Sequence, residues 1–593
     1  MKNLYRGINM ETIVRYNEDA LYKLRRRKIA LGEMKGEITG YPSIDMPWLK
    51  YYTEEQILAP IPHMSCYDYI RFCNNNNLNN IAIQFGDETI TYIELFKKIN
   101  DTAKALVKLG VKPGEIVSIV LPALPEEVYL FYALDYIGAC ANFIFPGSPM
   151  SEIEQNMREL GSAKIIIFED LLLQPNNLIN NENINIITKS FTETSLRYKN
   201  TKDWSTFIEE GKGVILPKYE RSEEEQLFIA KTSGTTSKPK NVVLNDRAFN
   251  MQAQQHLNSS LDYSNGDSWV RVWPLFSASS AVSSMHLPLC YGMKMIIEPL
   301  PDIDKTDELL MKYRPTHMVM ISSSIDSLTR SEIIKGQDLS FIKTLGIGGE
   351  GVTVEFEHKA NEFMKEHNIN SSMMYGYGMT ENASGATSRF NRQTSSPGAV
   401  GVPQINTVVS IFDPETNEEL TYGEEGEICI LSSSIMLGYY NNVEMTNKVL
   451  RKHSDGHIWL HSGDLGYMDE NGHLFVKGRI KRMIMLFSGN KIYPLDIEEL
   501  IETIEEVERA IIVPEPDPVH EGAVVPCAFV TLNTELTEQE LRRRINEILG
   551  EQMASFVSLN NIYIKKELPH TSIGKVDVKQ LERETHILAK RNK

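Results

Sequence analysis

The sequence predicts an α/β fold with two domains: a large N-terminal domain of parallel-rich, helix-covered sheets and a small α+β domain at the C-terminus. Three observations support this prediction. The chain has 593 residues, more than one hydrophobic core ordinarily holds. Helix and strand patterns alternate along its first part, which is typical of parallel sheets covered by helices. After Gly463 the pattern changes to short strands and turns.

The first 50 residues stand apart from the rest and are predicted to be an N-terminal extension, residues 1–50. Residues 21–31 are basic and have the spacing of an amphipathic helix, which either packs on the body of the protein or meets a membrane surface or a partner. Packing on the body is the commoner use of such a helix. The two prolines of residues 41–48 predict an extended connector, because proline biases the residue before it away from helix.

The large domain is expected over residues 51–480. Its first α/β unit lies between about Cys66 and Asp170, where apolar spacing predicts helices and buried strands and Gly110 is a natural C-cap. The second unit lies farther along the chain. The expected elements are helices over 92–109 and 126–137, and strands over 115–121, 164–168, 316–321 and 342–345.

The small domain is expected over residues 481–593. The turn signal Glu470-Asn471-Gly472 predicts a hairpin just before it. The elements expected within the domain are helices over 495–504 and 537–549, and strands near 510–513 and 526–532.

Composition and charge narrow the functional classes. The formal charge of −18 argues against a nucleic-acid partner, because nucleic-acid binding needs a concentrated basic face. The six cysteines have neither metal-ligand spacing nor a disulfide pattern, as is typical of a reducing compartment. The sequence contains no apolar run of about 18 residues, so it does not predict a transmembrane segment. We therefore expect a cytoplasmic protein.

The stretch from Lys231 to Lys240, KTSGTTSKPK, suits polyphosphate. Glycine lets the backbone approach an anion closely, hydroxyl groups donate hydrogen bonds, and lysine supplies positive charge. A polar surface turn is the alternative. Apolar runs at 227–230 and 241–244 predict that this loop joins two strands, whereas a Walker loop has the pattern GxxxxGK[ST] and opens into a helix.

A second glycine-rich segment, Gly346 to Gly351, matches the GxGxxG pattern of dinucleotide sites. Such a site also needs a helix directly after it and an acidic residue at the end of the next strand. The next apparent strand, residues 371–375, lacks that acid, so the match is a weak indication of a dinucleotide.

Residues 375–381, YGYGMTE, carry groups suited to nucleotide chemistry. Tyr377 can stack on a base, and Gly378 admits a close ligand. Thr380 and Glu381 offer oxygen ligands for Mg²⁺ beside phosphates. A tight turn with a chance glutamate explains this motif equally well when it is considered alone.

Three more motifs lie toward the C-terminus. In HSGDLG, Asp464 is held between glycines and can accept hydrogen bonds from both hydroxyls of a ribose, although an Asp-Gly turn alone also explains these residues. The other two motifs are GRIK at residues 478–481 and PHTSIGK at residues 569–575.

In content and in order, these motifs resemble those of the ANL superfamily of adenylate-forming enzymes, which includes acyl-CoA synthetases, peptide-synthetase adenylation domains and luciferases. The series is TSGTTSKPK, YGYGMTE, HSGDLG, GRIKRMI and PHTSIGK, and the resemblance covers about residues 51–581. It implies a two-step reaction: a carboxylate attacks the α-phosphate of ATP to give acyl-AMP and pyrophosphate, and a thiol then takes the acyl group. It therefore implies ATP, Mg²⁺, coenzyme A and a carboxylic acid as small-molecule partners.

The resemblance also implies roles for individual residues. Lys575 is expected to contact the α-phosphate and the attacking carboxylate. Glu381 and Thr235 are expected to hold Mg²⁺. Lys481 corresponds to the hinge of a mobile small domain, and Gly489 to a glycine that lines the pantetheine channel. The residues expected to bind nucleotide are Thr232, Ser233, Gly234, Thr235, Thr236, Lys240, Gly349, Glu350, Tyr377, Gly378, Thr380, Asp464 and Arg479.

The chain departs from the family pattern at a few positions. Serine or asparagine replaces a usual glycine or threonine at Ser237, Asn241, Ser432 and Ser462. These changes are expected to affect the geometry of the loops and the rate of the reaction more than the type of reaction. A larger departure is Ser277, where many CoA ligases have histidine or an aromatic residue. Peptide-synthetase domains carry in this motif an aspartate that pairs with an amino group, and its absence argues against an α-amino acid substrate.

The acyl pocket is expected where small residues leave room, at Phe276, Ser277, Ala278 and Gly348. Four methionines either fill the core or form an adaptable wall of this pocket, and core filling is the commoner use. These are Met318, Met320, Met373 and Met374. No charge is evident that would recognise a polar acid, so we expect a fatty or aromatic carboxylic acid.

Three functions stay open at this point. The leading one is a carboxylate–CoA ligase. The second is a stand-alone adenylating enzyme that loads the phosphopantetheine of an acyl carrier protein, which would be a separate molecule because the chain stops soon after Lys575. The third, a catalytically silent nucleotide-binding module, requires the loss of catalytic groups, yet Lys575, Glu381 and Asp464 are all present.

Overall fold

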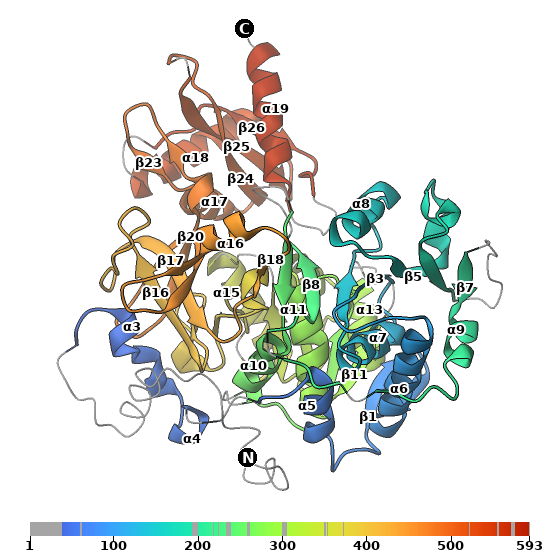
Figure 1. Ribbon diagram of the computed structural model, residues 1–593. Helices are drawn as coiled ribbons and strands as arrows, with labels where there is room; N and C mark the ends of the chain where they lie inside the picture. The colour runs from blue at the N-terminus through green and yellow to red at the C-terminus, as the bar shows by residue number, and fades with distance from the viewer. Residues whose placement is uncertain are drawn as a thin grey trace.

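The computed structural model describes residues 38–591 apart from 58, 60–61, 192–199, 218, 223, 233–238, 258–260, 299–304, 349–351, 353, 372, 521, 554–556 and 571–575. A large α/β domain forms most of this part of the chain, and a small α+β domain near the C-terminus lies above it in Figure 1. The predicted fold class is therefore confirmed. The predicted basic helix over residues 21–31 lies outside the described residues.

The first sheet of the large domain has eight strands and is mostly parallel. Only β9 runs against its neighbours, pairing antiparallel with β8 on one side and β18 on the other. In spatial order the strands are β18 (Gly438–Tyr439), β9 (Asn241–Leu244), β8 (Phe228–Lys231), β4 (Cys140–Phe143), β3 (Ile116–Val120), β5 (Lys164–Phe168), β6 (Asn185–Lys189) and β7 (Thr201–Asp203).

The second sheet has six strands and is also parallel, except for its edge pair β1 and β2. In spatial order the strands are β13 (Thr344–Ile347), β12 (His317–Met320), β10 (Ser268–Arg271), β11 (Lys294–Ile297), β1 (Ile81–Phe85) and β2 (Glu88–Thr91). Two short strands, β14 (Thr387–Ser388) and β15 (Val402–Pro403), pair beside the sheets.

The third sheet is antiparallel and lies next to the small domain in Figure 1. Its strands are β16 (Thr407–Phe412), β17 (Gly426–Ser432), β20 (Ile458–Met468), β19 (Leu450–Lys452) and β21 (Leu474–Arg479), with β21 paired to β20. The turn between β20 and β21 confirms the predicted hairpin. Because β21 is the last strand before the small domain, this sheet connects the two domains.

Helices cover the parallel sheets and complete the core. Phe131 of α7, for example, packs against Phe228 of β8 and Phe249 of α10 with ring centroids 6.2 and 5.1 Å away. The α-helices of the large domain beyond residue 52 are α4 (Glu54–Ile57), α5 (Cys66–Cys73), α6 (Tyr92–Lys108), α7 (Pro125–Tyr136), α8 (Met150–Leu160), α9 (Trp204–Glu210), α10 (Asp246–Leu257), α11 (Ala278–Ala281), α12 (Leu287–Cys290), α13 (Thr306–Tyr313), α14 (Ser322–Thr329), α15 (Val354–Glu366) and α16 (Val443–Val449).

The small domain has its own hydrophobic core, which includes Ile497, Ile512, Val530 and Ile545. Its main sheet pairs β24 (Val507–Pro516) with β25 (Val524–Leu532) and β25 with β26 (Ile562–Lys565). A two-stranded hairpin, β22 (Ile484–Met485) and β23 (Lys491–Ile492), precedes them. The helices are α17 (Pro494–Glu502), α18 (Glu538–Gln552) and α19 (Val578–Arg591).

Two short helices cover most of residues 41–48, so the predicted extended connector is wrong. α3 (Pro42–Asp45) and η1 (Pro47–Tyr51) each begin at a proline, which suits the first position of a helix because the N–H that it lacks would be unpaired there. Proline disfavours the helical conformation for the residue before it, and only these two residues are not helical here. Tyr41 is extended, and Met46 has a φ of 44°. Trp48 is 1% exposed, so the segment packs into the folded body.

The other predicted elements are present within a few residues of their expected bounds. The strand over 164–168 is β5, and the helix ending before Gly110 is α6, with Gly110 at a φ of 82°. The strand expected over 342–345 lies two residues later, and residues 371–375 form a single parallel bridge between Met374 and Gly346 in place of a strand. No helix in the described part of the chain is long and apolar enough to cross a membrane.

Candidate active site

A cleft of about 2000 Å³ lies where the large and small domains meet. Its walls combine residues of the two parallel sheets, the third sheet and the small domain. The predicted site residues that line it are Thr232, Lys240, Phe276, Ser277, Gly348, Tyr377, Gly378, Thr380, Glu381, Asp464, Arg479 and Lys481. Six segments separated along the chain therefore meet at one place.

Some predicted residues do not line the cleft. Ala278 is buried at the start of α11, and Gly489 is exposed on the hairpin of the small domain. Seven others lie outside the described residues, namely Ser233, Gly234, Thr235, Thr236, Gly349, Glu350 and Lys575.

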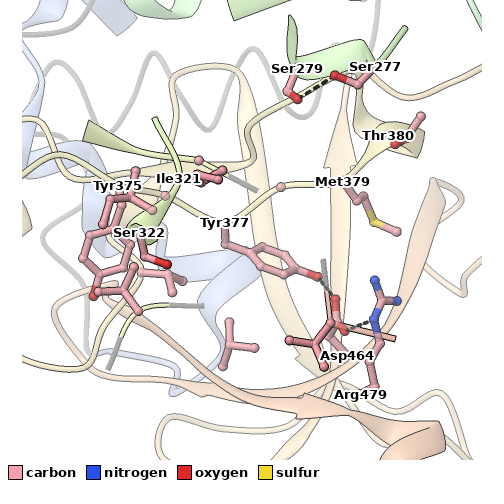
Figure 2. Close-up of a pocket in the computed structure, with 18 of the residues that line it drawn as sticks. Ser277, Ser279, Ile321, Ser322, Tyr375, Tyr377, Met379, Thr380, Asp464 and Arg479 are labelled. Atoms are coloured by element: carbon pink, nitrogen blue, oxygen red, sulfur yellow. Dashed lines mark hydrogen bonds and ion pairs between the residues drawn. The ribbon is translucent and has the colours of Figure 1, made fainter. Parts of the chain in front are cut away.

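Tyr377, Asp464 and Arg479 form one hydrogen-bonded cluster in the cleft (Figure 2). The Tyr377 hydroxyl donates to Asp464 Oδ2 at 2.5 Å, and Arg479 Nε lies 2.9 Å from Asp464 Oδ1. The pairing of β20 with β21 places Asp464 directly opposite Arg479. Burial raises the pKa of the Asp464 carboxyl, and the Arg479 charge opposes that shift. The structure thus brings together the residues predicted for adenine and ribose.

A buried carboxylate supports the backbone beside Asp464. Glu427 of β17 accepts a hydrogen bond from the Gly463 N–H at 2.9 Å and lies 2.8 Å from His461 Nδ1. Burial raises the pKa of Glu427, but the His461 ring and the Gly463 N–H lower it more, so that it lies below its ordinary value. Gly463 has a φ of 73°, a conformation that favours glycine. Glu427 therefore fixes the irregular part of β20 that presents Asp464.

Glu427→Gln is expected to raise the KM for ATP about tenfold, or about 1.4 kcal/mol, which is in the range for losing a hydrogen bond to a charged group. The amide keeps only one acceptor oxygen and offers an NH₂ group to His461 or Gly463. Initial rates at varied ATP would measure the effect, and Glu425→Gln, at an exposed neighbouring position, is the matched control. An unchanged KM would contradict the positioning role of Glu427.

Lys240, Tyr439 and Glu381 form a second group on the cleft wall. Lys240 Nζ lies 3.3 Å from the Tyr439 hydroxyl, which donates to Glu381 Oε1 at 2.7 Å. Burial lowers the pKa of Lys240, and the positive charges of Lys481 and Arg479 lower it further, whereas Glu381 raises it. Three cations therefore lie near one another at the cleft, an arrangement that favours a polyanionic ligand.

The ends of the predicted phosphate loop are tied together. The Thr232 N–H donates to the Lys240 carbonyl at 2.9 Å, and the Lys240 N–H donates to Thr232 Oγ1 at 3.0 Å. The loop joins two strands, β8 and β9, as the sequence predicted, and these strands pair antiparallel. Residues 233–238 between these ends lie outside the described part.

The residues present fit a magnesium ion. Glu381 is 8% exposed and lines the cleft, and only its Oε1 accepts the Tyr439 hydrogen bond. Carboxylate oxygen is a ligand that Mg²⁺ prefers, and Lys240 nearby suits the phosphates that accompany it. Thr235, the second predicted ligand, lies outside the described residues.

Gly378, which was predicted to admit a close ligand, lines the cleft and is also required by the backbone. A Cβ atom at this position would lie 1.7 Å from the Ser384 carbonyl oxygen. Residues 378 and 385 form an antiparallel bridge at this crossing. Any side chain at 378 would push apart the two segments that carry Tyr377 and Glu381.

The acyl side of the cleft is built on one irregular helix. Ser277 caps α11 by accepting the Ser280 N–H at 3.2 Å, and its hydroxyl lies 3.3 Å from that of Ser279. α11 continues into a π-helical turn, η4 (Val282–His286), and then α12; such turns are common at functional sites. In Figure 2, Ser277 and Ser279 lie on the other side of Tyr377 from Asp464 and Arg479.

The four methionines divide between the two predicted uses. Met318 and Met373 are buried in a hydrophobic cluster of the large domain and do not line the cleft. Met320 and Met374 line it. Met318 and Met320 are two residues apart on β12 and so face the same side of the sheet, but Met320 is the last residue of the strand and reaches the cleft, whereas Met318 stays within the core.

The small domain presents the neighbours of Lys575 to the cleft. His570 and Val576 line the cleft and form an antiparallel bridge. Residues 571–575, which lie between these two, are outside the described part of the chain. Gly489 lies on the exposed hairpin of the same domain, where Phe487 is 68% exposed and stacks on His520 with centroids 3.9 Å apart.

Some residues of the site were missed at the level of sequence. Glu427 and Tyr439 were assigned no role from the sequence. Their partners, His461 and Glu381, lie within recognised motifs. The need of these two motif residues for polar partners was therefore the signal that could have pointed to Glu427 and Tyr439. His256, Tyr263 and Gln404 also line the cleft, and no local pattern distinguishes them.

A large and a small domain with a cleft between them are typical of a two-domain enzyme. The AMP-binding enzyme profile matches residues 71–440, and the profile of the AMP-binding enzyme C-terminal domain matches residues 496–575. The chain belongs to the AMP-binding enzyme family. The predicted membership in the adenylate-forming superfamily, as an AMP-forming acid–thiol ligase, is thereby confirmed.

Similar proteins have been characterised. The 4-coumarate–CoA ligase of Vanilla planifolia is 28% identical over 535 residues, covering 88% of this chain and 92% of that protein. The solved anthranilate CoA ligase AuaEII, in complex with anthranoyl-AMP, has a TM-score of 0.76 at 20% identity over 88% of this chain and 98% of that chain. The o-succinylbenzoate CoA synthetase MenE of Bacillus subtilis has a TM-score of 0.71 at 21% identity over 86% of this chain and 97% of that chain.

Proposed function

We propose that the protein is an ATP- and Mg²⁺-dependent carboxylate–CoA ligase that activates a fatty or aromatic carboxylic acid as acyl-AMP and transfers the acyl group to the thiol of CoA. The observation that carries this proposal is the single cleft. It joins the Tyr377–Asp464–Arg479 cluster, the serine-lined wall at Ser277 and the segment beside Lys575. An adenylating reaction needs these three components around one point.

The chemistry of the first step explains the cations. A carboxylate anion must attack the α-phosphate of ATP, which is also anionic, so positive charge has to be in place before the reaction. Lys240, Arg479 and Lys481 supply such charge along the cleft. Lys575 is assigned to the α-phosphate and the attacking oxygen, where the new bond forms.

The nucleotide is assigned to the large domain. Tyr377 offers its ring to adenine, and Asp464 with Arg479 takes the ribose hydroxyls. Glu427 and His461 hold the part of β20 that carries Asp464. The departing pyrophosphate is assigned to Thr232, Ser233, Gly234, Thr235, Thr236 and Lys240, and Gly349 with Glu350 is assigned to the nucleotide.

Glu381 would hold the magnesium ion together with Thr235. A bound Mg²⁺ neutralises charge on the phosphates. Tyr439 orients the Glu381 carboxylate through its hydrogen bond to Oε1, and the same hydroxyl fixes Lys240 at the phosphate end of the cleft.

The domain orientation suits the first half-reaction. Residues next to Lys575 line the cleft, whereas Gly489, assigned to the pantetheine channel, is exposed away from it. We place the domain boundary at Lys481, between domains at residues 51–480 and 481–593. A swing of the small domain about this residue would remove Lys575 and bring Gly489 to the cleft for the second half-reaction.

The similar proteins bear on the acid and the acceptor. 4-Coumarate–CoA ligase and anthranilate CoA ligase are named for aromatic acids and for CoA. These names favour an aromatic acid over a fatty acid and CoA over a carrier protein. Six free thiols, none in a disulfide, agree with the cytoplasmic location that we propose.

ATP–pyrophosphate exchange across a panel of fatty and aromatic acids tests the first half of the proposal. Acid-dependent exchange, followed by acyl-CoA formation when CoA is added, is the expected result. Exchange without transfer to CoA, but with transfer to an acyl carrier protein, would overturn the assignment of the acceptor. A lack of exchange with every acid would overturn the proposed reaction.

A further inference from the structure

Helix α8 contacts both ends of the predicted phosphate loop. Lys231, the last residue of β8, and Asn241, the first residue of β9, lie opposite each other in the antiparallel pair. Lys231 Nζ lies 2.8 Å from Glu152 Oε1, and Asn156 Nδ2 donates to Asn241 Oδ1 at 3.2 Å. Glu152 and Asn156 are four residues apart on α8, so they share one face of the helix. One face of α8 therefore binds the two strand ends from which the loop extends.

The two contacts of α8 differ in burial. The side chains of Lys231 and Glu152 are 29% and 39% exposed, and ion pairs at such sites contribute little because water screens them. Asn156 is 2% exposed. Its hydrogen bond with Asn241 forms away from bulk water, where an unpaired amide would lose its hydration without compensation. We therefore expect the contact of Asn156 with Asn241 to be the stronger of the two.

Buried polar side chains hold the Asn156 amide in one orientation. Asn156 Oδ1 accepts a hydrogen bond from Asn142 Nδ2 at 2.8 Å, and Asn142 Nδ2 also donates to Ser118 Oγ at 3.2 Å. Asn142 of β4 is 2% exposed, and Ser118 of β3 is fully buried. Both polar groups of the Asn156 amide have partners, so turning the amide over would break both hydrogen bonds. A chain of polar contacts thus runs from the interior of the first sheet, through α8, to Asn241.

This chain reaches Lys240 through the backbone. Asn241 follows Lys240 directly, and its carbonyl accepts the Tyr440 N–H at 2.8 Å. Asn241 is therefore held both through its side chain and through its backbone. Asn142, Asn156 and Lys240 all line the cleft. Fixing Asn241 therefore fixes the point at which Lys240 enters the cleft.

We infer that Asn156 is a positioning residue for pyrophosphate: through Asn241 it sets the place of Lys240, and of Thr232, which pairs with Lys240. Asn241 is one of the departures from the family pattern, since a glycine usually stands there. Glycine has no side chain for Asn156 to hold, and its backbone is freer. The inference rests on the proposed function, in which this loop takes the departing pyrophosphate.

ATP–pyrophosphate exchange at varied pyrophosphate tests the inference. Asn156→Leu keeps the branched shape but removes both hydrogen bonds, and it is expected to raise the KM for pyrophosphate about tenfold. The KM for the acid should change by less than about twofold, because a positioning role at the loop affects one substrate and not the other. Gln155→Leu is the matched control: Gln155 is an exposed neighbour on α8 that donates to Glu159 Oε1 at 2.8 Å, and both KM values should stay unchanged.

Asn241→Gly removes the same contact from the other side and leaves α8 intact, so it decides the matter even if Asn156→Leu does not fold. We expect it to raise the KM for pyrophosphate to a similar extent. The double variant should show no larger rise than either single variant, because both substitutions remove one shared contact. An unchanged KM for pyrophosphate in Asn241→Gly, or an equal rise in the KM for the acid, would overturn the inference and leave the proposed function intact. A lack of exchange by the unmodified protein with every acid would instead count against the proposed function.

Discussion

Lys575→Ala is expected to lower the rate of acyl-AMP formation by at least about 10²-fold, the order of loss seen when one strong oxyanion donor is removed. The bond that forms joins two anions, so losing the one cation assigned to both of them raises the barrier of this step most. In the second half-reaction Lys575 has no such role, so the rate of that step should be largely unchanged. ATP–pyrophosphate exchange measures the first step, and CoA-dependent consumption of supplied acyl-AMP measures the second.

The structure supports this role through the neighbours of Lys575. His570 and Val576 pair with each other at the cleft wall, and the Asp577 N–H donates to the Pro569 carbonyl at 2.7 Å. The described residues on both sides of Lys575 therefore line the cleft. Lys566→Ala is the matched control, because Lys566 is an exposed cation of the same domain that also lines the cleft. If Lys575→Ala slowed both half-reactions equally, the assignment of Lys575 to acyl-AMP formation would be wrong.

The sequence predicted the fold where local pattern and tertiary packing agree. β5 is a run of buried apolar residues between parallel neighbours, and its bounds follow from composition alone. The segment around Trp48 was predicted wrongly because proline favours the start of a helix as well as an extended predecessor, and burial of Trp48 decided between them. Local rules left two conformations open, and packing selected one.

The candidate site likewise has one part that sequence motifs predict and another part that only tertiary packing creates. Asp464 and Arg479 lie in recognisable motifs, and the pairing of β20 with β21 puts them together. Gln404 and Tyr263 come from distant segments with no motif, so only the folded chain shows that both contact His256 or its ring. These contacts could not be predicted, because they join segments that are distant in the sequence and depend on the tertiary structure alone.

The connection between the domains is anchored on both sides of Lys481. Before it, Arg479 binds the large domain through Asp464 at 2.9 Å and the Ser462 carbonyl at 3.1 Å. After it, Arg482 binds the small domain through Glu498 at 2.5 Å. Only Ile480 and Lys481 lie between these anchors, within the short helix η8 (Ile480–Arg482). A rotation that preserves both anchors must therefore use the backbone dihedrals of these two residues.

Lys481→Pro is accordingly expected to slow acyl transfer to CoA by about 10²-fold, the order of loss when reacting groups are misplaced by about 1 Å. Proline fixes φ at 481 and restricts Ile480, so the small domain cannot reach its second orientation. Pyrophosphate exchange should persist, because the orientation in the structure already serves the first step. Lys481→Ala is the control that removes the charge near Lys240 but keeps backbone freedom, and transfer to CoA should survive in it better than in the proline variant. Unaltered transfer in Lys481→Pro would mean that the domains pivot elsewhere.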